Sequence, residues 1–464
     1  MSSETLRVYL QRAGWSPREL AHAVNARLKR IADRKHQIHP TAPYHWLSRG
    51  YCPYPPVPEV VAEVLSERLG QPITADLIWP GRTSALSAMA NAGTGLAGPW
   101  VPSTAVRLLD DLVRSSGSDR RRIRPSNGLE LVTLTLDGLA PPVDPVQAAV
   151  DGEKVLPPMM DLVADRIAAL RRLDDRQGGG MLSLRYVLGE LRTVLDLIKG
   201  AAYSQEVGGR LHLAAADLAQ LTGWMHFDAG IDGAGQRYFL LGLRLARAGD
   251  DLATTANIMG MLAYHVAHAG QPAEAIRIAE AACDVARRAS IGMQARAAGR
   301  LATAHAAAGD IHSFRAAADR ARTLLARRRP EDDPPSIYYL SSAQLDAEAG
   351  QALVDLAAQN PGHARHLLAE AVELLTPLTS AGLREDFQRS ALLHGGYLAL
   401  AHLHRRDLEQ AASATHTALT RLPGVQSGRC RSLLTRLRRE LARRKRNGWV
   451  ADILPELDKA LWSA

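Results

Sequence analysis

Short stripes of apolar residues at helical spacing, separated by turn residues, open the chain. Leu6 and Leu10 share one helical face, and Gly14 follows them as a C-terminal stop. Ser16 is placed to cap a second helix, with Glu19 in the capping-box position. A new apolar stripe then runs over residues 20–24. The pattern predicts two helices joined by a tight turn, which is typical of a helix-turn-helix.

A third helix is expected between Pro40, which stops the preceding basic stretch, and Gly50, which turns the chain. Trp46 and Leu47 are expected to face the first two helices. The outward positions of this helix are then Thr41, Ala42, Tyr44 and His45.

Two further helical stretches complete the N-terminal set. Apolar residues recur at helical spacing over 58–69, and the segment ITADLIWPG predicts a last short helix. Its expected anchors are Leu77, Ile78 and Trp79. A stretch rich in Gly, Ala, Ser and Pro follows, so residues 83–158 are predicted to be a linker with weak structure. It would join a domain at 1–82 to one at 159–464.

From about residue 160 the chain reads as helix almost to its end, and it repeats itself. A turn followed by a helix of small residues starts at Gly230, Gly270 and Gly309, and continues from Gln359 and Arg406. Five and twelve positions after these residues, all but one position hold Gly or Ala: Gly235, Ala275, Phe314, Ala364, Ala411, Gly242, Ala282, Ala321, Ala371 and Ala418. Small residues let paired helices approach closely, so we expect a solenoid of antiparallel helix pairs.

Composition agrees with an all-α protein, since 46% of residues are hydrophobic but only 5% aromatic. Three cysteines, Cys52, Cys283 and Cys430, are odd in number and lie far apart without metal-type spacing. They argue against a disulfide framework and against a zinc site, and we expect no metal and no cofactor.

No enzyme signature stands out, because the sequence holds no phosphate-binding loop, no HExxH and no GxSxG. We therefore expect a protein that is not an enzyme. No apolar run is long enough to span a membrane, and the chain starts without a secretory h-region. These features favour a cytoplasmic protein that does not enter a membrane.

The net charge of +8 is distributed unevenly. Residues 1–50 hold nine Lys and Arg against three acids, 9 − 3 = +6, which favours a polyanionic partner. A second basic cluster spans Arg421–Arg446, where Glu440 is the single acid. This cluster is either a solvated helix face or an additional contact to DNA.

The ordered segments LRVYLQRAGWSPRELAHAVN, WLSRG and PPVPEVVAEVLSERLGQPITADLIWPG resemble the lambda-repressor-like, XRE-type helix-turn-helix domain of actinobacterial regulators. The resemblance covers residues 1–82. It implies that the third helix lies in the major groove of double-stranded DNA, where Thr41, Ala42, Tyr44 and His45 would touch bases. The residues expected to contact phosphates are Arg18, Arg34, Lys35 and Arg49. Alternatively, Tyr44 and His45 pack under the Pro-rich loop at 51–58.

One feature departs from the simplest members of that family. The stretch between the second and third helices, Arg27–Pro40, is longer than the family's tight link.

The segment LAQLTGWMHFDAGIDGAGQRYFLLGLRLA resembles a tetratricopeptide repeat, and the likeness extends over roughly 160–446. It implies a concave groove that holds a peptide, a protein segment or a small molecule. Candidates to line this groove are Trp224, Asp228, Arg237, Tyr238, Tyr264 and His265. Alternatively, Trp224, Tyr238 and Tyr264 belong to the core between helices. The segment DDRQGGG at 174–180 is interpreted as an exposed loop.

The combined arrangement resembles actinobacterial tetratricopeptide regulators of sporulation and antibiotic production. It implies a cytoplasmic, homodimeric repressor that binds double-stranded DNA and responds to an effector held in the groove. The alternative is a scaffold that does not bind DNA and assembles protein partners. Basic residues before the third helix and polar residues on its outer face favour the regulator.

Overall fold

The computed structural model describes residues 2–31, 37–53, 57–71, 73, 75–79, 91–379 and 387–462. Over these ranges the regular structure is helical, and extended residues pair only in isolated bridges such as Asn91 with Arg124. The all-α fold is therefore confirmed. The chain forms two compact units, one of residues 1–94 with 116–124 and one of residues 95–115 with 125–464.

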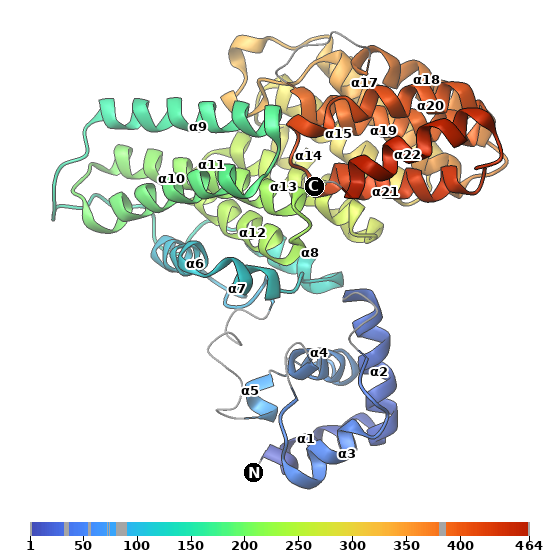
Figure 1. Ribbon diagram of the computed structural model, residues 1–464. Helices are drawn as coiled ribbons and strands as arrows, with labels where there is room; N and C mark the ends of the chain where they lie inside the picture. The colour runs from blue at the N-terminus through green and yellow to red at the C-terminus, as the bar shows by residue number, and fades with distance from the viewer. Residues whose placement is uncertain are drawn as a thin grey trace. The chain divides into compact units, whose positions relative to one another are not determined.

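The N-terminal unit is built from short helices around one apolar core. Its helices are α1 (Ser2–Ala13), α2 (Pro17–Ile31), α3 (Ala42–Arg49), α4 (Val57–Leu69), α5 (Ala75–Ile78) and α7 (Gly117–Arg122) (Figure 1). The core gathers the apolar faces of α1, α2 and α4, with Trp46 from α3 and Trp79 after α5. The two indole rings meet edge to face, with centroids 6.1 Å apart and planes at 84°. This contact fastens α3 to the rest of the unit.

The expected helix boundaries of this unit are confirmed by its caps. The Ser16 backbone N–H donates to Oε2 of Glu19 at 2.6 Å, and the Glu19 N–H donates to the Ser16 hydroxyl oxygen at 3.2 Å. Gly14 and Gly50 follow α1 and α3 with φ of 65° and 61°. Because that left-handed region disfavours residues with a Cβ, glycine is the natural residue at both exits.

Two residues of this unit differ from their expected orientation. Leu77, predicted to anchor α5, is 50% exposed, whereas Ile78 and Trp79 are fully buried as expected. A helix of four residues is about one turn long, so it turns only one side to the core. Ala42 was expected on the outer face of α3 but is half-buried and packs against the apolar core.

The stretch predicted to be a weakly structured linker is helical in its described part. Besides α7, it contains α6 (Pro102–Arg114) and α8 (Gly128–Asp137), which belong to the C-terminal unit. Leu109 of α6 and Leu131 of α8 are fully buried. Each of these helices has a short amphipathic stripe, although the segments around it are rich in Gly and Pro. The linker prediction was therefore wrong for these helices.

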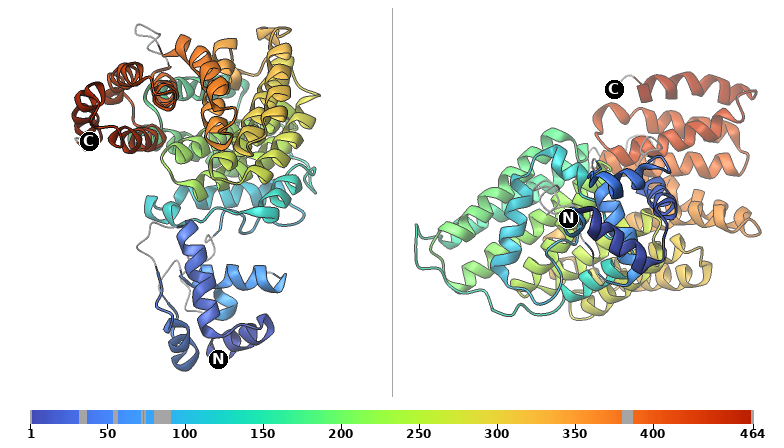
Figure 2. Two further views of the ribbon diagram at one scale, coloured as in Figure 1. Left: turned by 90° about the vertical axis from the view of Figure 1, so that its right-hand side faces the viewer. Right: turned by 90° about the horizontal axis from the view of Figure 1, so that it is seen from below.

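The C-terminal unit consists mainly of long helices that follow one another in space as in sequence (Figures 1 and 2). They are α9 (Pro157–Gln177), α10 (Met181–Gly200), α11 (Gln205–Asp228), α12 (Asp232–Ala248), α13 (Leu252–His268), α14 (Pro272–Ala286), α15 (Ile291–Ala307), α16 (Ile311–Leu325), α17 (Ser342–Gln359), α18 (Ala364–Leu375), α19 (Gln388–His404), α20 (Leu408–Leu419), α21 (Gly428–Ala442) and α22 (Gly448–Trp462). Short turns join α11 to α12, α13 to α14 and α15 to α16, and each of these pairs packs together. Such short connections make the paired helices antiparallel.

Close helix contacts occur at the repeated small residues. Of the ten positions named above, nine are buried and Ala364 is half-buried. A Cβ on Gly235 would lie 3.0 Å from the Gly223 carbonyl oxygen of the facing helix, and a Cβ on Gly242 would lie 3.2 Å from the Ala219 side chain. The expectation that small residues permit close pairing is therefore confirmed at these positions.

None of the helices in the described part of the chain is both long and apolar enough to cross a membrane.

Candidate functional site

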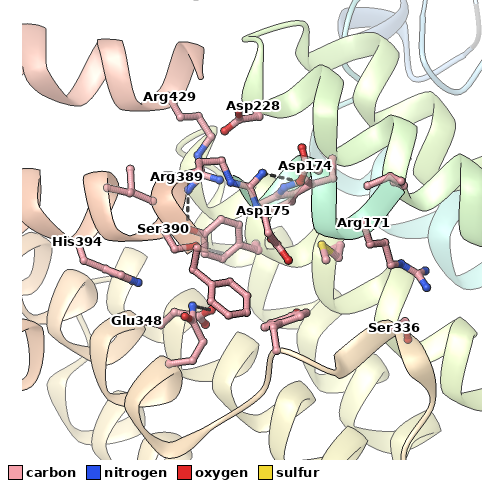
Figure 3. Close-up of a pocket in the computed structure, with 18 of the residues that line it drawn as sticks. Arg171, Asp174, Asp175, Asp228, Ser336, Glu348, Arg389, Ser390, His394 and Arg429 are labelled. Carbon is pink, nitrogen blue, oxygen red and sulfur yellow. Dashed lines mark hydrogen bonds and ion pairs between the residues drawn. The ribbon is translucent and has the colours of Figure 1, made fainter. Parts of the chain in front are cut away.

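A pocket opens among the helices of the C-terminal unit and encloses about 860 Å³ of empty space, its mouth included. It is lined from α9, α11, α13, α15, α17, α19 and α21 and from the 3₁₀ turn Pro335–Ile337 (Figure 3). Its charged residues are Arg171, Asp174, Asp175, Asp228, Arg300, Glu348, Arg389 and Arg429. Pockets that combine apolar surface with a few polar groups are typical sites for small organic molecules.

One wall of the pocket is an ion-pair group between α9 and α19. Nη1 of Arg389 donates to Oδ2 of Asp174 at 2.7 Å, and Nη2 donates to Oδ1 of Asp175 at 3.1 Å (Figure 3). The Tyr338 hydroxyl donates to Oδ2 of Asp175. Burial raises the pKa of Asp174 to about 7, although the Arg389 guanidinium opposes the shift. Asp174 is therefore a carboxyl group that gains or loses a proton near neutral pH.

The opposite side of the pocket carries Glu348 of α17, held by two arginines of α15. Oε2 of Glu348 lies 2.5 Å from Nη2 of Arg296 and 3.6 Å from Nη1 of Arg300. Burial alone raises the pKa of Glu348, but the two guanidinium groups outweigh burial and hold that pKa well below its ordinary value. Glu348 is therefore ionised, and its charge is matched inside the protein.

His394 of α19 presents a neutral ring to the pocket. Burial lowers its pKa to about 4. Its Nδ1 lies 2.6 Å from the amide nitrogen of Gln351. An amide nitrogen only donates, so Nδ1 accepts and the ring proton is on Nε2. His394 thus offers a neutral N–H donor on its other side.

Arginines and aromatic rings alternate along the pocket. The Arg389 and Arg429 guanidinium carbons lie 5.3 and 5.1 Å from the centroid of the Trp224 ring. Arg429 and Arg300 lie 5.2 and 4.3 Å from the centroid of the Tyr264 ring, and Arg429 also donates to the Tyr264 hydroxyl at 2.8 Å. These cation–π contacts join α11, α13, α15, α19 and α21 along one wall of the pocket.

A contact between distant parts of the chain lies beside this wall, and we call it the clasp; it consists of residues 177–180, 228 and 426–428. The Gln426 N–H donates to the Gln177 carbonyl oxygen at 2.6 Å, and the Ser427 hydroxyl donates to Oδ1 of Asp228 at 2.8 Å. A Cβ on Gly179 would lie 2.8 Å from the Met225 carbonyl oxygen. The clasp therefore needs glycine where backbone meets backbone.

The clasp corrects the interpretation of DDRQGGG as an exposed loop. Gly178, Gly179 and Gly180 are buried, and Asp174 and Asp175 line the pocket. Three successive glycines signal a close backbone approach as well as a flexible loop, and the sequence alone does not distinguish the two.

The six groove candidates divide into two groups. Trp224, Asp228 and Tyr264 line the pocket. The other three, Arg237, Tyr238 and His265, are buried between helices outside it.

Each residue of the second group has an interior role. His265 directs Nε2 to Oδ1 of Asp232 at 3.2 Å. Tyr238 packs against the ring of His226, with centroids 5.0 Å apart. Burial lowers the pKa of Arg237 to about 10. The alternative of an inter-helix core position therefore describes Tyr238, and it also describes Tyr264, which is buried although it lines the pocket. Trp224 is half-buried in the pocket wall.

Most of the pocket's charged residues escaped the sequence analysis. Arg389, Glu348 and His394 lie in helices α17 and α19, which carry no motif, and Arg429 belongs to the basic cluster Arg421–Arg446. Another member of that cluster, Arg436, lies 3.0 Å from Asp355, and both residues are half-buried.

A second hollow adjoins the pocket and encloses about 1050 Å³. It shares Tyr264, Glu348 and Gln351 with the pocket and is also lined by His268 and Tyr397. Burial lowers the pKa of His268 to about 3, so its ring is neutral. The two hollows are therefore neighbours, separated by side chains that line both.

The N-terminal unit holds the other candidate surface, the outer face of α3. Thr41, Tyr44 and His45 are exposed, and Tyr44 exposes 51% of its surface. The Thr41 hydroxyl lies 2.7 Å from Nδ1 of His39. Tyr44 and His45 therefore do not pack beneath another segment of the described chain.

The expected phosphate contacts can be placed only in part. Arg18 is exposed in the first turn of α2. Arg34 and Lys35 lie outside the described residues. Arg49 is the last residue of α3, and its side chain is not described either.

Comparison with protein families finds a likeness in the N-terminal helices. A family model described as the SP15 N-terminal domain matches residues 6–78. This range runs from within α1 to the end of α5 and is well under half of the chain. Searches of curated proteins and of solved structures found no match.

Proposed function

We propose that the protein is a sequence-specific, DNA-binding transcriptional regulator whose C-terminal unit binds a regulatory ligand. The observation that carries the proposal is the division of α3 into two faces. Trp46 is 3% exposed and packs on Trp79, whereas Tyr44 and His45, immediately before it, are exposed. A helix held from behind, with polar and aromatic side chains in front, suits insertion into the major groove.

Base contacts would come from Thr41, Tyr44 and His45, and phosphate contacts from the basic surface around them. Arg18 is exposed, and residues 1–50 have a net charge of 9 − 3 = +6. Ala42 is half-buried and so has less surface for a thymine methyl group than the sequence analysis expected. Affinity would therefore depend strongly on salt, while specificity would depend on the outer face of α3.

The remaining features of the proposal concern regulation. The protein would act in the cytoplasm as a homodimer on two half-sites and repress genes of development or secondary metabolism, as the resemblance to the actinobacterial regulators implies. The effector, a small molecule, a peptide or a protein segment, would occupy the groove of the C-terminal unit. The buried ion pairs and cation–π contacts there support this part of the proposal, because a ligand that disturbs them shifts several helices at once.

The test is selection of binding sites from random DNA duplexes by the purified full-length protein. We expect one enriched motif, arranged as two half-sites if the protein dimerises. The variant Tyr44→Ala/His45→Ala should lose the motif but keep its thermal stability, because both side chains are exposed. Binding to the selected site should weaken steeply as salt rises.

The matched control is Tyr186→Ala/His366→Ala, which removes an exposed tyrosine and an exposed histidine from the C-terminal unit. It should select the same motif as the wild type. Weak binding without a motif, unchanged by Tyr44→Ala/His45→Ala, would contradict the proposal and favour the protein-assembling scaffold.

A further inference from the structure

We infer that the pocket of the C-terminal unit binds an uncharged organic molecule that carries an amide-like pair of hydrogen-bond donor and acceptor on an apolar body. The inference deepens the proposed function and rests on it in taking this pocket as the regulatory site. Three observations carry the inference: the balance of charge in the lining, the buried polar atoms without partners, and the apolar surface between them.

The lining holds equal numbers of arginines and carboxyl groups. Among the described residues it contains four arginines and four carboxylates, 4 − 4 = 0 when all are ionised. Three of the arginines have a carboxylate within ion-pair distance: Arg171 pairs with Asp217, Arg300 with Glu348 and Arg389 with Asp174. A ligand with a net charge would leave that charge uncompensated in a buried site, which is costly.

Arg429 is the arginine for which the described residues supply no ion pair. Its guanidinium group is held by the Tyr264 hydroxyl and by the faces of Trp224, Phe227 and Tyr264. The carboxylate of Asp228 also acts on it and contributes to raising its pKa. Arg429 is therefore already stabilised as a cation, although it is the residue by which a ligand carboxylate would be recognised.

Four polar groups of the lining have no hydrogen-bond partner among the described residues. They are Oδ1 of Asp174, Nε2 of His394, the Ser336 hydroxyl and the Tyr339 hydroxyl. Asp174, His394 and Ser336 are 3%, 1% and 6% exposed. They lie on different sides of the pocket in Figure 3. Buried polar groups are nearly always paired in native proteins, so this set calls for partners from outside the chain.

The chemistry of these groups selects the ligand. His394 donates from Nε2, and the two hydroxyls both donate and accept. Asp174 accepts when ionised and donates when protonated. A ligand that offers both a donor and an acceptor, as a primary amide does, can pair with members of such a mixed set.

The rest of the lining suits an apolar frame. Leu221, Met261, Phe387 and Leu393 contribute carbon surface between the polar groups. Burying an apolar body there supplies affinity, while the polar groups orient it.

The test compares uncharged, acidic and basic forms of one frame on the full-length protein in the absence of DNA. The probes are indole-3-acetamide, indole-3-acetate and tryptamine, with decanamide, decanoate and decylamine as a second triad. Dissociation constants are measured by ligand-detected NMR. At least one amide should bind, about tenfold or more tightly than its acid and its amine.

The variant Ser336→Ala/Tyr339→Phe locates that binding. It removes only two hydroxyls for which the described part of the chain supplies no partner, so the fold should be kept. The bound amide should weaken by about fivefold or more. The control Ser413→Ala/Tyr186→Phe removes two exposed hydroxyls outside the pocket and should bind like the wild type.

Each contrary result overturns the inference. It fails if neither amide binds, if an acid or an amine binds more tightly than its amide, or if Ser336→Ala/Tyr339→Phe binds the amide as the wild type does. The DNA selection described above is separate from this measurement. Amide binding without any DNA motif would leave the pocket inference standing and remove the regulator proposal.

Discussion

Arg389 of α19 donates to Asp174 of α9 at 2.7 Å across 215 residues of sequence. The two residues are 7% and 3% exposed. The same guanidinium group stacks on Trp224 of α11. One side chain therefore ties the first long helix of the C-terminal unit to a helix near its end.

Removal of the cation from this pair should destabilise the protein strongly. Arg389→Met leaves Asp174 buried without its counter-charge, and we expect the free energy of unfolding to fall by about 3–5 kcal/mol. Urea unfolding followed by circular dichroism measures the change.

Arg438→Met is the matched control, because Arg438 also pairs with an aspartate, Asp458, but both side chains are 36% exposed. It should cost much less than Arg389→Met. The double variant Asp174→Leu/Arg389→Met should recover part of the loss. Equal losses for the two arginine variants would contradict the assignment of Arg389 as a buried structural cation.

The contribution of Asp174 to stability should fall as pH rises toward neutrality. The pKa of this carboxyl is about 7 in the folded chain and 3.8 as its ordinary value. Between these pH values the folded chain holds a proton that the unfolded chain has lost. The contribution of this group to the free energy of unfolding is therefore highest below pH 4 and declines up to about pH 7. Its slope is at most about 1.4 kcal/mol per pH unit.

Asp174→Asn should flatten that decline in urea titrations between pH 5 and 7. Burial also raises the pKa of Asp175, so part of the slope should remain. Asp332→Asn, which neutralises an exposed carboxylate, should leave the curve unchanged. A pH dependence that is the same in Asp174→Asn as in the wild type would show that Asp174 stays ionised.

Two glycine-to-alanine changes should have opposite effects. At Gly179 the new Cβ would meet the Met225 carbonyl oxygen at 2.8 Å, so the clasp must shift and thermal stability should fall. At Gly189 in α10 nothing lies within 4 Å of the new Cβ, and alanine should stabilise the helix by about 0.5–1 kcal/mol. Thermal unfolding of both variants checks the prediction, and a Gly179→Ala protein as stable as the wild type would show that the clasp tolerates a side chain.

Substitution of two aromatic residues of α3 should distinguish the residue that anchors the helix from one that lies on its surface. Trp46→Ala leaves a cavity against Trp79 and should cost about 3–5 kcal/mol. Tyr44→Ala removes an exposed ring and should change stability little. Hydrogen–deuterium exchange of α3 in the full-length protein distinguishes them: exchange should accelerate in the Trp46 variant alone. Equal exchange in both would mean that Trp46 does not fasten the helix.

Local signals in the sequence were sufficient for many of the helices. The Ser16–Glu19 capping box and the Gly14 and Gly50 exits depend on neighbours within a few residues, so they were predictable. The repeated small residues after Gly230 and Gly270 were predictable as helix contacts for the same reason, because a close helix pair needs them regardless of what else surrounds it.

Orientation within short or weakly periodic segments was harder to predict. Leu77 and Ala42 lie in helices, as expected. Their exposure depends on which side of a one-turn or two-turn helix meets the core. The helices α6 and α8 carry apolar stripes of normal spacing, but the Gly and Pro residues around them favoured the prediction of a linker. Burial by other helices is what stabilises such short elements, and no local pattern records it.

The sequence by itself determined the helical class of the protein, the turns and caps that bound many of its helices, and the small residues at which helices pair. These features depend on backbone preferences and on residues close in the chain. Only the tertiary structure decided the pocket: Asp174, Asp228, Glu348, Arg389 and Arg429 come from five helices, and each would be an ordinary polar residue in isolation. Their charges matter because burial removes water from around them, and burial is a property of the folded chain.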